Sequence, residues 1–279
     1  MNIREALPHF DVHFADLDQY IRELVEAYKT GKIRSWDDLA ERVNAYFTPE
    51  RMEDMEARAS GWRKMASYRE GMTLVHVMCV FLGLYMMPEF LSMTREQQQI
   101  MKWVILFHDI EKEPQEGKRD HAHAFRSAVA AARILPKLGF PVTVEYDSLI
   151  DGWAEYTRAA ITKAEGSPHT IQDNRRLPEI LDGIEKMFEP NSPAALIIKT
   201  ILFHLSSIDM LAWPAPSPLT EEEVSRYFNA DLVLLLRAMN LGDSEGWNMF
   251  NASREPLRQE TLRAFEKVEQ LIHDKDEVI

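Results

Sequence analysis

Apolar residues recur at helical spacing along most of the chain, and this periodicity constrains the fold more than any other feature. Within residues 16–28, Leu17, Ile21, Leu24 and Val25 fall on one face of a helix. No segment alternates apolar and polar residues over a length that would build a sheet. The sequence therefore predicts an all-α protein of 279 residues.

Capping residues mark the ends of several predicted helices. Ser35 and Thr94 each precede an apolar periodic segment, where a hydroxyl can cap the first helical turn. Gly139 follows the helix expected at residues 122–138, so a left-handed C-cap is predicted there. A short extended segment is considered at residues 141–146. Further helices are expected at residues 71–90, 94–108, 147–163, 177–188, 193–213, 221–240 and 255–273.

The longest apolar run, LVHVMCVFLGLYMM at residues 74–87, is short of the roughly 20 residues that span a membrane. The N-terminal residues carry charges throughout and show no apolar secretory core. Cys79 is the single cysteine, which excludes an intrachain disulfide and fits a reducing compartment. We therefore expect a soluble cytoplasmic protein with no membrane partner.

The formal net charge of −13 argues against nucleic acid as a general partner. An acidic surface repels the phosphate backbone, so we expect no broad nucleic-acid binding. A small phosphorylated substrate stays open, because a bound divalent cation reverses the local charge inside a cleft.

No linker rich in Pro, Gly or Ser separates the first helices from the rest of the chain. Their apolar faces need a partner, so we expect them to pack onto the following bundle. The prediction is a single all-helical domain over residues 1–279. It consists of an N-terminal helical extension at 1–69, a core at about 70–215, and C-terminal helices at 216–279.

The segment WVILFHDIEKE brings an apolar helix end, with His108 and Asp109, into a polar loop. Helical neighbours point about 100° apart, yet two neighbours can ligate one ion that lies just past the helix end. His76 lies in a buried helix upstream, and Asp209 lies in a buried helix downstream. A buried ionised carboxylate needs a cation or hydrogen-bond donors, and a shared metal would satisfy all three helices. The alternative is a chance His-Asp pair with satisfied core histidines.

This ordered set, His76, His108-Asp109 and Asp209, resembles the HD-domain superfamily of metal-dependent phosphohydrolases. Lys112 follows His108 by four residues, as in a frequent segment of that family, and the segment from His123 is similar to the family's next helix. The resemblance covers residues 70–215 and implies an HD-domain-like helical bundle with additional N- and C-terminal helices. Residues 149–153 offer an aspartate where two-metal members carry a histidine, so the number of metal ions stays open.

The candidate metal ligands are therefore His76, His108, Asp109 and Asp209. Imidazole together with carboxylate suits Fe, Mn, Zn or Ni, with Mg less favoured. Asp109 is also the candidate catalytic residue that orients a water or accepts its proton.

Three cationic or neutral side chains are candidates for binding the phosphoryl group: Lys112, which also has a catalytic role, His123 and Arg126. For Lys112 and Arg126 the alternative is a solvated surface charge. His121 and His123 would face different ways on a helix, and the family spacing favours His123. His204 lies about 140° around a helix from Asp209, so a core histidine is expected first and a role beside the site second.

The preferred hypothesis is hydrolysis of a phosphoester in a small phosphorylated metabolite or nucleotide, by a water that the metal activates. Two alternatives remain. One is a di-iron oxygenase on an HD-like scaffold. The other is a non-enzymatic helical ligand-binding or interaction protein.

Overall fold

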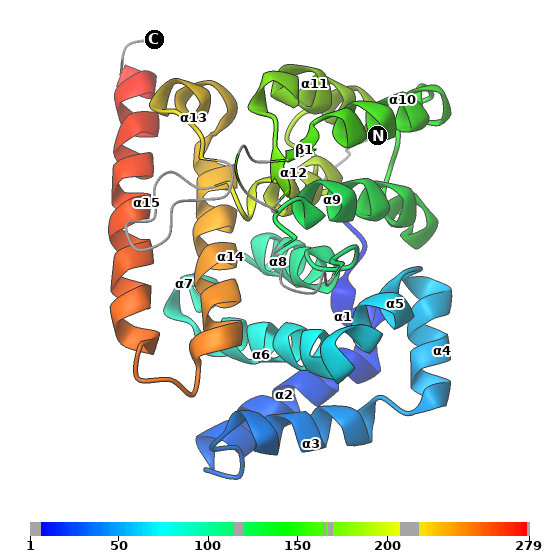
Figure 1. Cartoon of the computed structure of the whole chain (residues 1–279), viewed down its shortest axis with the longest axis vertical. Helices are drawn as coiled ribbons and strands as arrows, with labels where there is room; N and C mark the ends of the chain where they lie inside the picture. The colour runs from blue at the N-terminus through cyan, green and yellow to red at the C-terminus, as the bar shows by residue number, and fades with distance from the viewer. Residues whose placement is uncertain (1–6, 114–119, 164–165, 167–169, 207–217, 278–279) are drawn as a thin grey trace.

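The computed structural model describes residues 7–113, 120–163, 166, 170–206 and 218–277, and helices make up most of them (Figure 1). The all-α prediction is confirmed. Within the described residues, the strands are β1 (Ile161–Lys163) and β2 (Thr170–Gln172), which pair antiparallel. Residues 141–145 form a loop and turn instead of a strand.

The helices include short 3-10 turns, labelled η. In chain order they are α1 (Phe10–His13), α2 (Ala15–Lys29), α3 (Trp36–Tyr46), α4 (Pro49–Arg58), α5 (Trp62–Ser67), η2 (Tyr68–Gly71), α6 (Met72–Met86), α7 (Pro88–Leu91), α8 (Arg95–Phe107), α9 (His123–Ile134), η3 (Leu135–Leu138), α10 (Tyr146–Ala159), η4 (Asn174–Arg176), α11 (Leu177–Phe188), α12 (Pro193–Phe203), α13 (Glu221–Tyr227), α14 (Ala230–Asn248) and α15 (Arg254–Glu277).

Helices α6, α8, α12 and α14 form the centre of the bundle (Figure 1). α6 packs along α14, while α12 contacts α8, α9 and α14. α6 is apolar on nearly every side, and a helix of that kind is stable only when neighbours cover it all round. Its position between α14 and the N-terminal helices provides that cover.

The N-terminal helices lie against α6 and α8. The amide of Phe10 donates to Gln99 Oε1 on α8 at 2.7 Å, and Trp103 Nε1 donates to the Pro8 carbonyl at 2.8 Å. Lys102 on α8 forms a buried ion pair with Asp18 on α2, with Nζ and Oδ1 2.7 Å apart. These contacts hold the first helices against the helices that carry His76 and His108.

Several helix ends lie where the capping residues predict them. Ser35 and Thr94 each accept a hydrogen bond from the backbone of their third helical residue, and Gly139 has a φ of 95°. Other ends differ from prediction. The helix expected at 193–213 ends at Phe203, and the one expected at 221–240 is divided into α13 and α14, where Asn229 caps α14.

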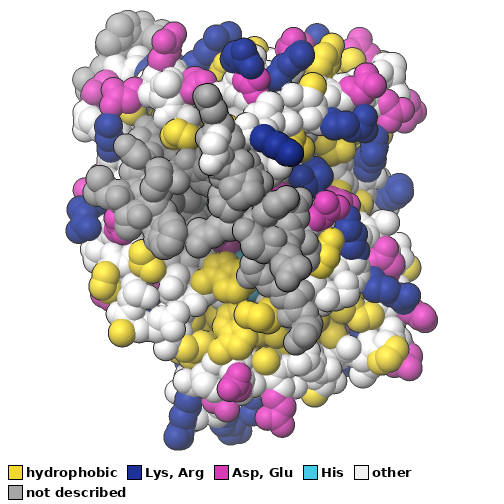
Figure 2. Space-filling model, viewed as in Figure 1, with side chains coloured by type: hydrophobic (Ala, Val, Ile, Leu, Met, Phe, Trp, Pro, Cys, Tyr) yellow, Lys and Arg dark blue, Asp and Glu magenta, His cyan; other side chains and the backbone are white. Residues whose placement is uncertain are grey.

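No helix among the described residues is both long and apolar enough to cross a membrane. Figure 2 shows charged side chains of both signs around the edge of one face, with hydrophobic side chains gathered nearer its centre. The candidate site lies inside, where the ends of α8 and α12 meet α6, α9 and α14.

Candidate metal centre

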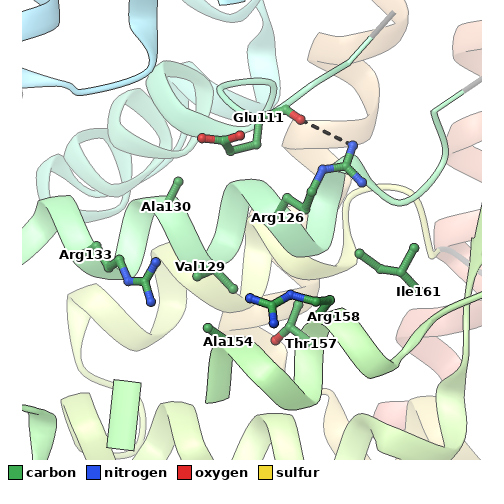
Figure 3. A pocket seen from close by; sticks show the side chains of 9 residues that line it. All are labelled: Glu111, Arg126, Val129, Ala130, Arg133, Ala154, Thr157, Arg158 and Ile161. Atoms are coloured by element: carbon green, nitrogen blue, oxygen red, sulfur yellow. Dashed lines mark hydrogen bonds between the residues drawn. The ribbon is translucent and has the colours of Figure 1, made fainter. Parts of the chain in front are cut away.

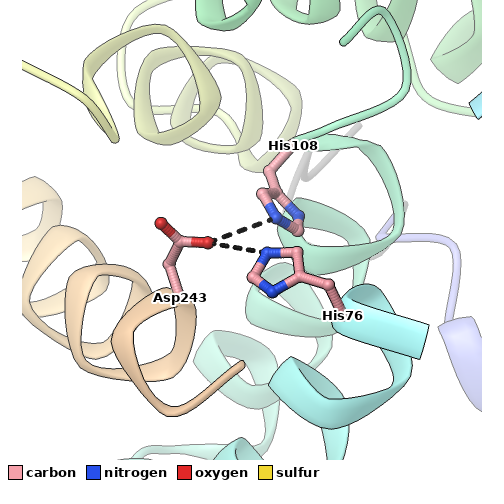
Figure 4. A group of neighbouring side chains, drawn as sticks. All are labelled: His76, His108 and Asp243. Carbon is pink, nitrogen blue, oxygen red and sulfur yellow. Dashed lines mark hydrogen bonds and ion pairs between the residues drawn. The ribbon is translucent and has the colours of Figure 1, made fainter. Parts of the chain in front are cut away.

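His76, His108 and Asp243 come from three different helices and meet at one point (Figure 4). His76 lies within α6, His108 is the C-cap residue of α8, and Asp243 lies in α14. His76 Nε2 is 2.9 Å from Asp243 Oδ1, and His108 Nε2 is 3.8 Å from the same oxygen. Both imidazoles are fully buried.

Asp109 joins this group to a second one. Its Oδ2 atom is 3.6 Å from His76 Nε2 and 3.6 Å from His108 Nε2. Its Oδ1 atom is 2.9 Å from His123 Nε2. One carboxylate oxygen therefore faces each group, so Asp109 could contribute to holding a cation in either of them.

The second group consists of Asp109, His123 and His204. His123 is the first residue of α9, and His204 is the C-cap residue of α12. Their Nε2 atoms lie 3.2 Å apart, and both side chains are buried. Together the two groups offer four imidazoles and two carboxylates from five helices or helix ends.

Two of the histidines occupy equivalent positions in a repeated sequence. The letters ILFH occur at residues 105–108 and again at 201–204, each time at the end of an apolar helix. His108 Nδ1 donates to the Ile105 carbonyl at 2.9 Å, and His204 Nδ1 donates to the Ile201 carbonyl at 2.7 Å. The same local fold thus aims both Nε2 atoms past the helix end.

Hydrogen bonds determine the tautomers of three imidazoles. A carbonyl oxygen can only accept, so Nδ1 carries the proton in His108 and His204, and also in His123, whose Nδ1 donates to the Asp120 carbonyl at 2.5 Å. Each Nε2 then presents a lone pair to the cluster. The Nε2 atoms of His123 and His204 lie 3.2 Å apart and face each other, so a cation bound between them would accept both lone pairs.

The distances fit a transition metal. Ligand atoms at about 2.1 Å from an ion are about 3.0 Å apart at right angles and about 3.4 Å apart in a tetrahedron. The distances from His76 Nε2 and His108 Nε2 to the oxygens of Asp109 and Asp243 run from 2.9 to 3.8 Å. His108 Nε2 is buried and has no hydrogen-bond partner among the described residues, as expected for a ligand atom.

Two residues of α14 hold the His76 ring in place. Trp247 stacks on it with ring centroids 4.1 Å apart and an angle of 16° between the planes. Gly246 leaves room for it, since a Cβ atom there would lie 2.6 Å from His76 Nδ1 and 2.5 Å from a methyl group of Val80. Only glycine permits this approach of α14 to α6.

Burial favours the neutral form of His108 and His204, while both carboxylates of the cluster stay ionised. Burial lowers the pKa of His108, and it lowers the pKa of His204 to about 3. Burial alone would raise the pKa of Asp109, but Lys112 and the neighbouring histidines hold it well below its usual range. Burial opposes ionisation of Asp243 too, but the hydrogen bond from His76 and the charge interactions with His76 and His108 together outweigh it, so the pKa of Asp243 is lowered. This is the protonation state that metal ligands need.

The predicted phosphoryl-binding residues lie in different places. Lys112 is at the cluster, with Nζ 2.7 Å from Asp109 Oδ2 and a quarter of its side chain exposed. His123 lies among the ligand-capable residues, while His121 precedes α9 and is half-buried. Arg126 pairs with Asp120 and points its guanidinium toward the Glu111 carbonyl instead of the cluster.

Sequence reasoning found His76, His108 and Asp109, which the structure brings together. Asp209 lies outside the described residues. Sequence reasoning missed Asp243 and did not assign His204 to the cluster. The ILFH repeat is the signal that points to His204, because His108 had already been singled out in the same four letters. For Asp243 the signal is its position between Gly242 and Gly246. Two glycines on one helix indicate that a neighbouring helix approaches closely there, which brings the carboxylate into the interior.

Comparison with known proteins gives no significant match to a protein-family model, a curated protein or a solved structure. The functional conclusion therefore depends on the cluster itself.

Proposed function

We propose that this protein is a metal-dependent phosphohydrolase that acts on a small phosphorylated metabolite or nucleotide. The observation that carries the proposal is the Asp109 carboxylate shared between two ligand groups, with the Lys112 ammonium beside it. The sequence order of His76, His108-Asp109 and the distal Asp209 resembles the HD-domain superfamily, and Asp243 is a further carboxylate that the structure adds to this cluster.

The imidazole and carboxylate ligands determine which metal ions the site favours. His76, His108, Asp109 and Asp243 would hold one ion, and Asp109, His123 and His204 would hold a second. Four imidazoles favour Fe, Mn, Zn or Ni over Mg. When bound, such ions polarise a phosphoryl oxygen and lower the pKa of a bound water toward neutrality.

The remaining chemistry belongs to the chain's own residues. Asp109 is ionised throughout the neutral range, so it serves as ligand and as acceptor that orients the attacking water. Lys112 is anchored by Asp109 and still a quarter exposed, so its ammonium can reach a phosphoryl oxygen and offset the charge that develops there. Asp243 is 26% exposed, and together with Lys112 it marks the side from which a substrate can approach.

The test begins with the metal content of protein purified without added metal. Phosphate release from phosphomonoesters, phosphodiesters and nucleotides is then measured for the wild type and for Asp109→Ala. We expect the variant to lose bound metal and to lose activity by several orders of magnitude, while its helical circular dichroism is retained. The matched control, Asp147→Ala, removes an exposed aspartate and should keep both. Full turnover and full metal content in Asp109→Ala would contradict the proposal.

One specific observation favours a second candidate, a di-iron oxygenase. The two groups supply six protein ligands with four imidazoles, a set that also suits two irons. Oxygen separates the two functions, because phosphate release proceeds without it and an oxygenase requires it. Turnover that stops under anaerobic conditions, in protein with two irons per chain, would favour the oxygenase. Absence of bound metal and of any turnover would favour the helical binding protein.

A further inference from the structure

A pocket between α9 and α10 brings three arginines together in an acidic protein (Figure 3). It encloses about 280 Å³, and Arg126, Arg133 and Arg158 line it together with Glu111. Val129, Ala130 and Ala154 contribute small apolar side chains between them. The chain as a whole carries a net charge of −13, so this local excess of positive charge runs against the average.

Two of the three arginines, Arg133 and Arg158, have weak partners or none among the described residues. Arg158 forms no ion pair with any described residue. Arg133 pairs with Asp151 at 2.9 Å, but the Asp151 side chain is 88% exposed, and such surface pairs contribute little. Arg126 is paired with Asp120 through Nη2, and only its Nε is buried without a hydrogen-bond partner among the described residues. Figure 3 shows the guanidinium groups of Arg133 and Arg158 in the space between the two helices.

The carboxylate of Glu111 is partly offset by Lys64, which also pairs with Glu113 at 2.9 Å. Glu111 Oε2 lies 3.3 Å from Lys64 Nζ on α5. Arg158 and the weakly paired Arg133 therefore give the pocket an excess of positive charge. Guanidinium groups bind phosphate and carboxylate through paired N–H donors.

The pocket adjoins the candidate metal centre. Glu111 follows Asp109 by two residues, its amide donates to Ser127 Oγ on α9 at 3.1 Å, and its carbonyl accepts from Arg126. His123, Arg126 and Arg133 lie within about 80° of one another around α9, and Arg126 is about 5 Å along the axis from His123. The same helix face thus runs from a metal ligand into the pocket.

We propose that this pocket binds a phosphate or carboxylate group of a small molecule. Two sources share this chemistry. One is a second anionic group on the substrate of the adjacent centre, and the other is a separate small anion. The proposal does not depend on the phosphohydrolase function, because an anion can bind here whatever the centre does.

The first arm of the test titrates the full chain, with its metal content as purified, with inorganic phosphate in a calorimeter. We expect a binding event whose affinity falls about tenfold or more in Arg133→Gln and in Arg158→Gln, since each loses a charged hydrogen bond. Arg175→Ala is the matched control, because Arg175 is 89% exposed and pairs with Asp173 away from the pocket lining. Unchanged affinity in both glutamine variants, or no binding by the wild type, would overturn the proposal.

The second arm distinguishes the two sources. It compares kcat/KM for a sugar bisphosphate with kcat/KM for the matching monophosphate, in the wild type and in Arg158→Gln. If the pocket binds a second anionic group of the substrate, the ratio of kcat/KM for the bisphosphate to kcat/KM for the monophosphate should fall about tenfold in the variant. An unchanged ratio, together with lost phosphate binding, assigns the pocket to a separate small anion.

Discussion

The close approach of α14 to α6 gives the sharpest test of how the centre is built. Replacing Gly246 by Ala places a Cβ atom 2.6 Å from two atoms of the His76 ring and 2.5 Å from Val80 Cγ2. Neither neighbour can yield easily, because His76 is also held between Trp247 and the carboxylates. The ring must therefore move away from its position beside Asp243.

The expected magnitude combines two opposing effects. Overpacking a well-packed interior costs about 1–3 kcal/mol. Alanine is preferred over glycine inside a helix by about 1 kcal/mol, which offsets part of that cost. Gly152 provides the control, since it lies inside α10 with nothing within 4 Å of an added Cβ. Gly152→Ala should gain the helical preference alone, so the two variants should differ by about 1–3 kcal/mol in the free energy of unfolding.

Metal affinity is the second measurement. A ligand moved out of position weakens binding by about 10- to 100-fold, as loss of a positioning contact does in other metal sites. We expect this loss in Gly246→Ala and not in Gly152→Ala, measured by competition with a chelator of known affinity. If Gly246→Ala binds metal like the wild type and unfolds like Gly152→Ala, the argument from the His76 ring is wrong.

Three further predictions concern other parts of the molecule. His204→Ala should lower the metal content from two ions per chain to one by elemental analysis, whereas an unchanged content would remove His204 from the ligand set. Lys102→Met should lower the free energy of unfolding by about 3–5 kcal/mol in a denaturant titration, because it leaves Asp18 buried without its ammonium partner. A loss below about 1 kcal/mol would mean that Arg22 and Tyr85 alone stabilise the Asp18 carboxylate. Burial opposes ionisation of Asp18, but hydrogen bonds from Lys102 and Tyr85 lower its pKa. The contribution of ionised Asp18 to the free energy of unfolding is therefore complete above the unfolded pKa of about 3.9. This contribution is lost as the pH falls toward the lower pKa of the folded state. Below neutral pH, the free energy of unfolding should therefore fall less steeply with decreasing pH in Lys102→Met than in the wild type. Identical pH dependence in the two proteins would contradict the role given to Asp18.

Local residues alone determined the helical class and many helix ends. Ser35 and Thr94 cap their helices through atoms three residues away, and Gly139 takes its left-handed conformation for reasons internal to the turn. Such interactions are encoded within a few residues, so a sequence pattern can identify them. The pairing of His108 with Asp109 at a helix end is local in the same sense.

The tertiary structure decided which distant residues complete the centre. Asp243 is 167 residues from His76, and the sequence between them contains other carboxylates that a pattern cannot rank. The helix expected to run through His204 ends at Phe203, which turns His204 toward His123 instead of leaving it on a helix face. Helical periodicity shows which residues face the interior. It does not show which interior residues meet, because that depends on how closely the helices approach one another, as Gly246 allows α14 to approach His76.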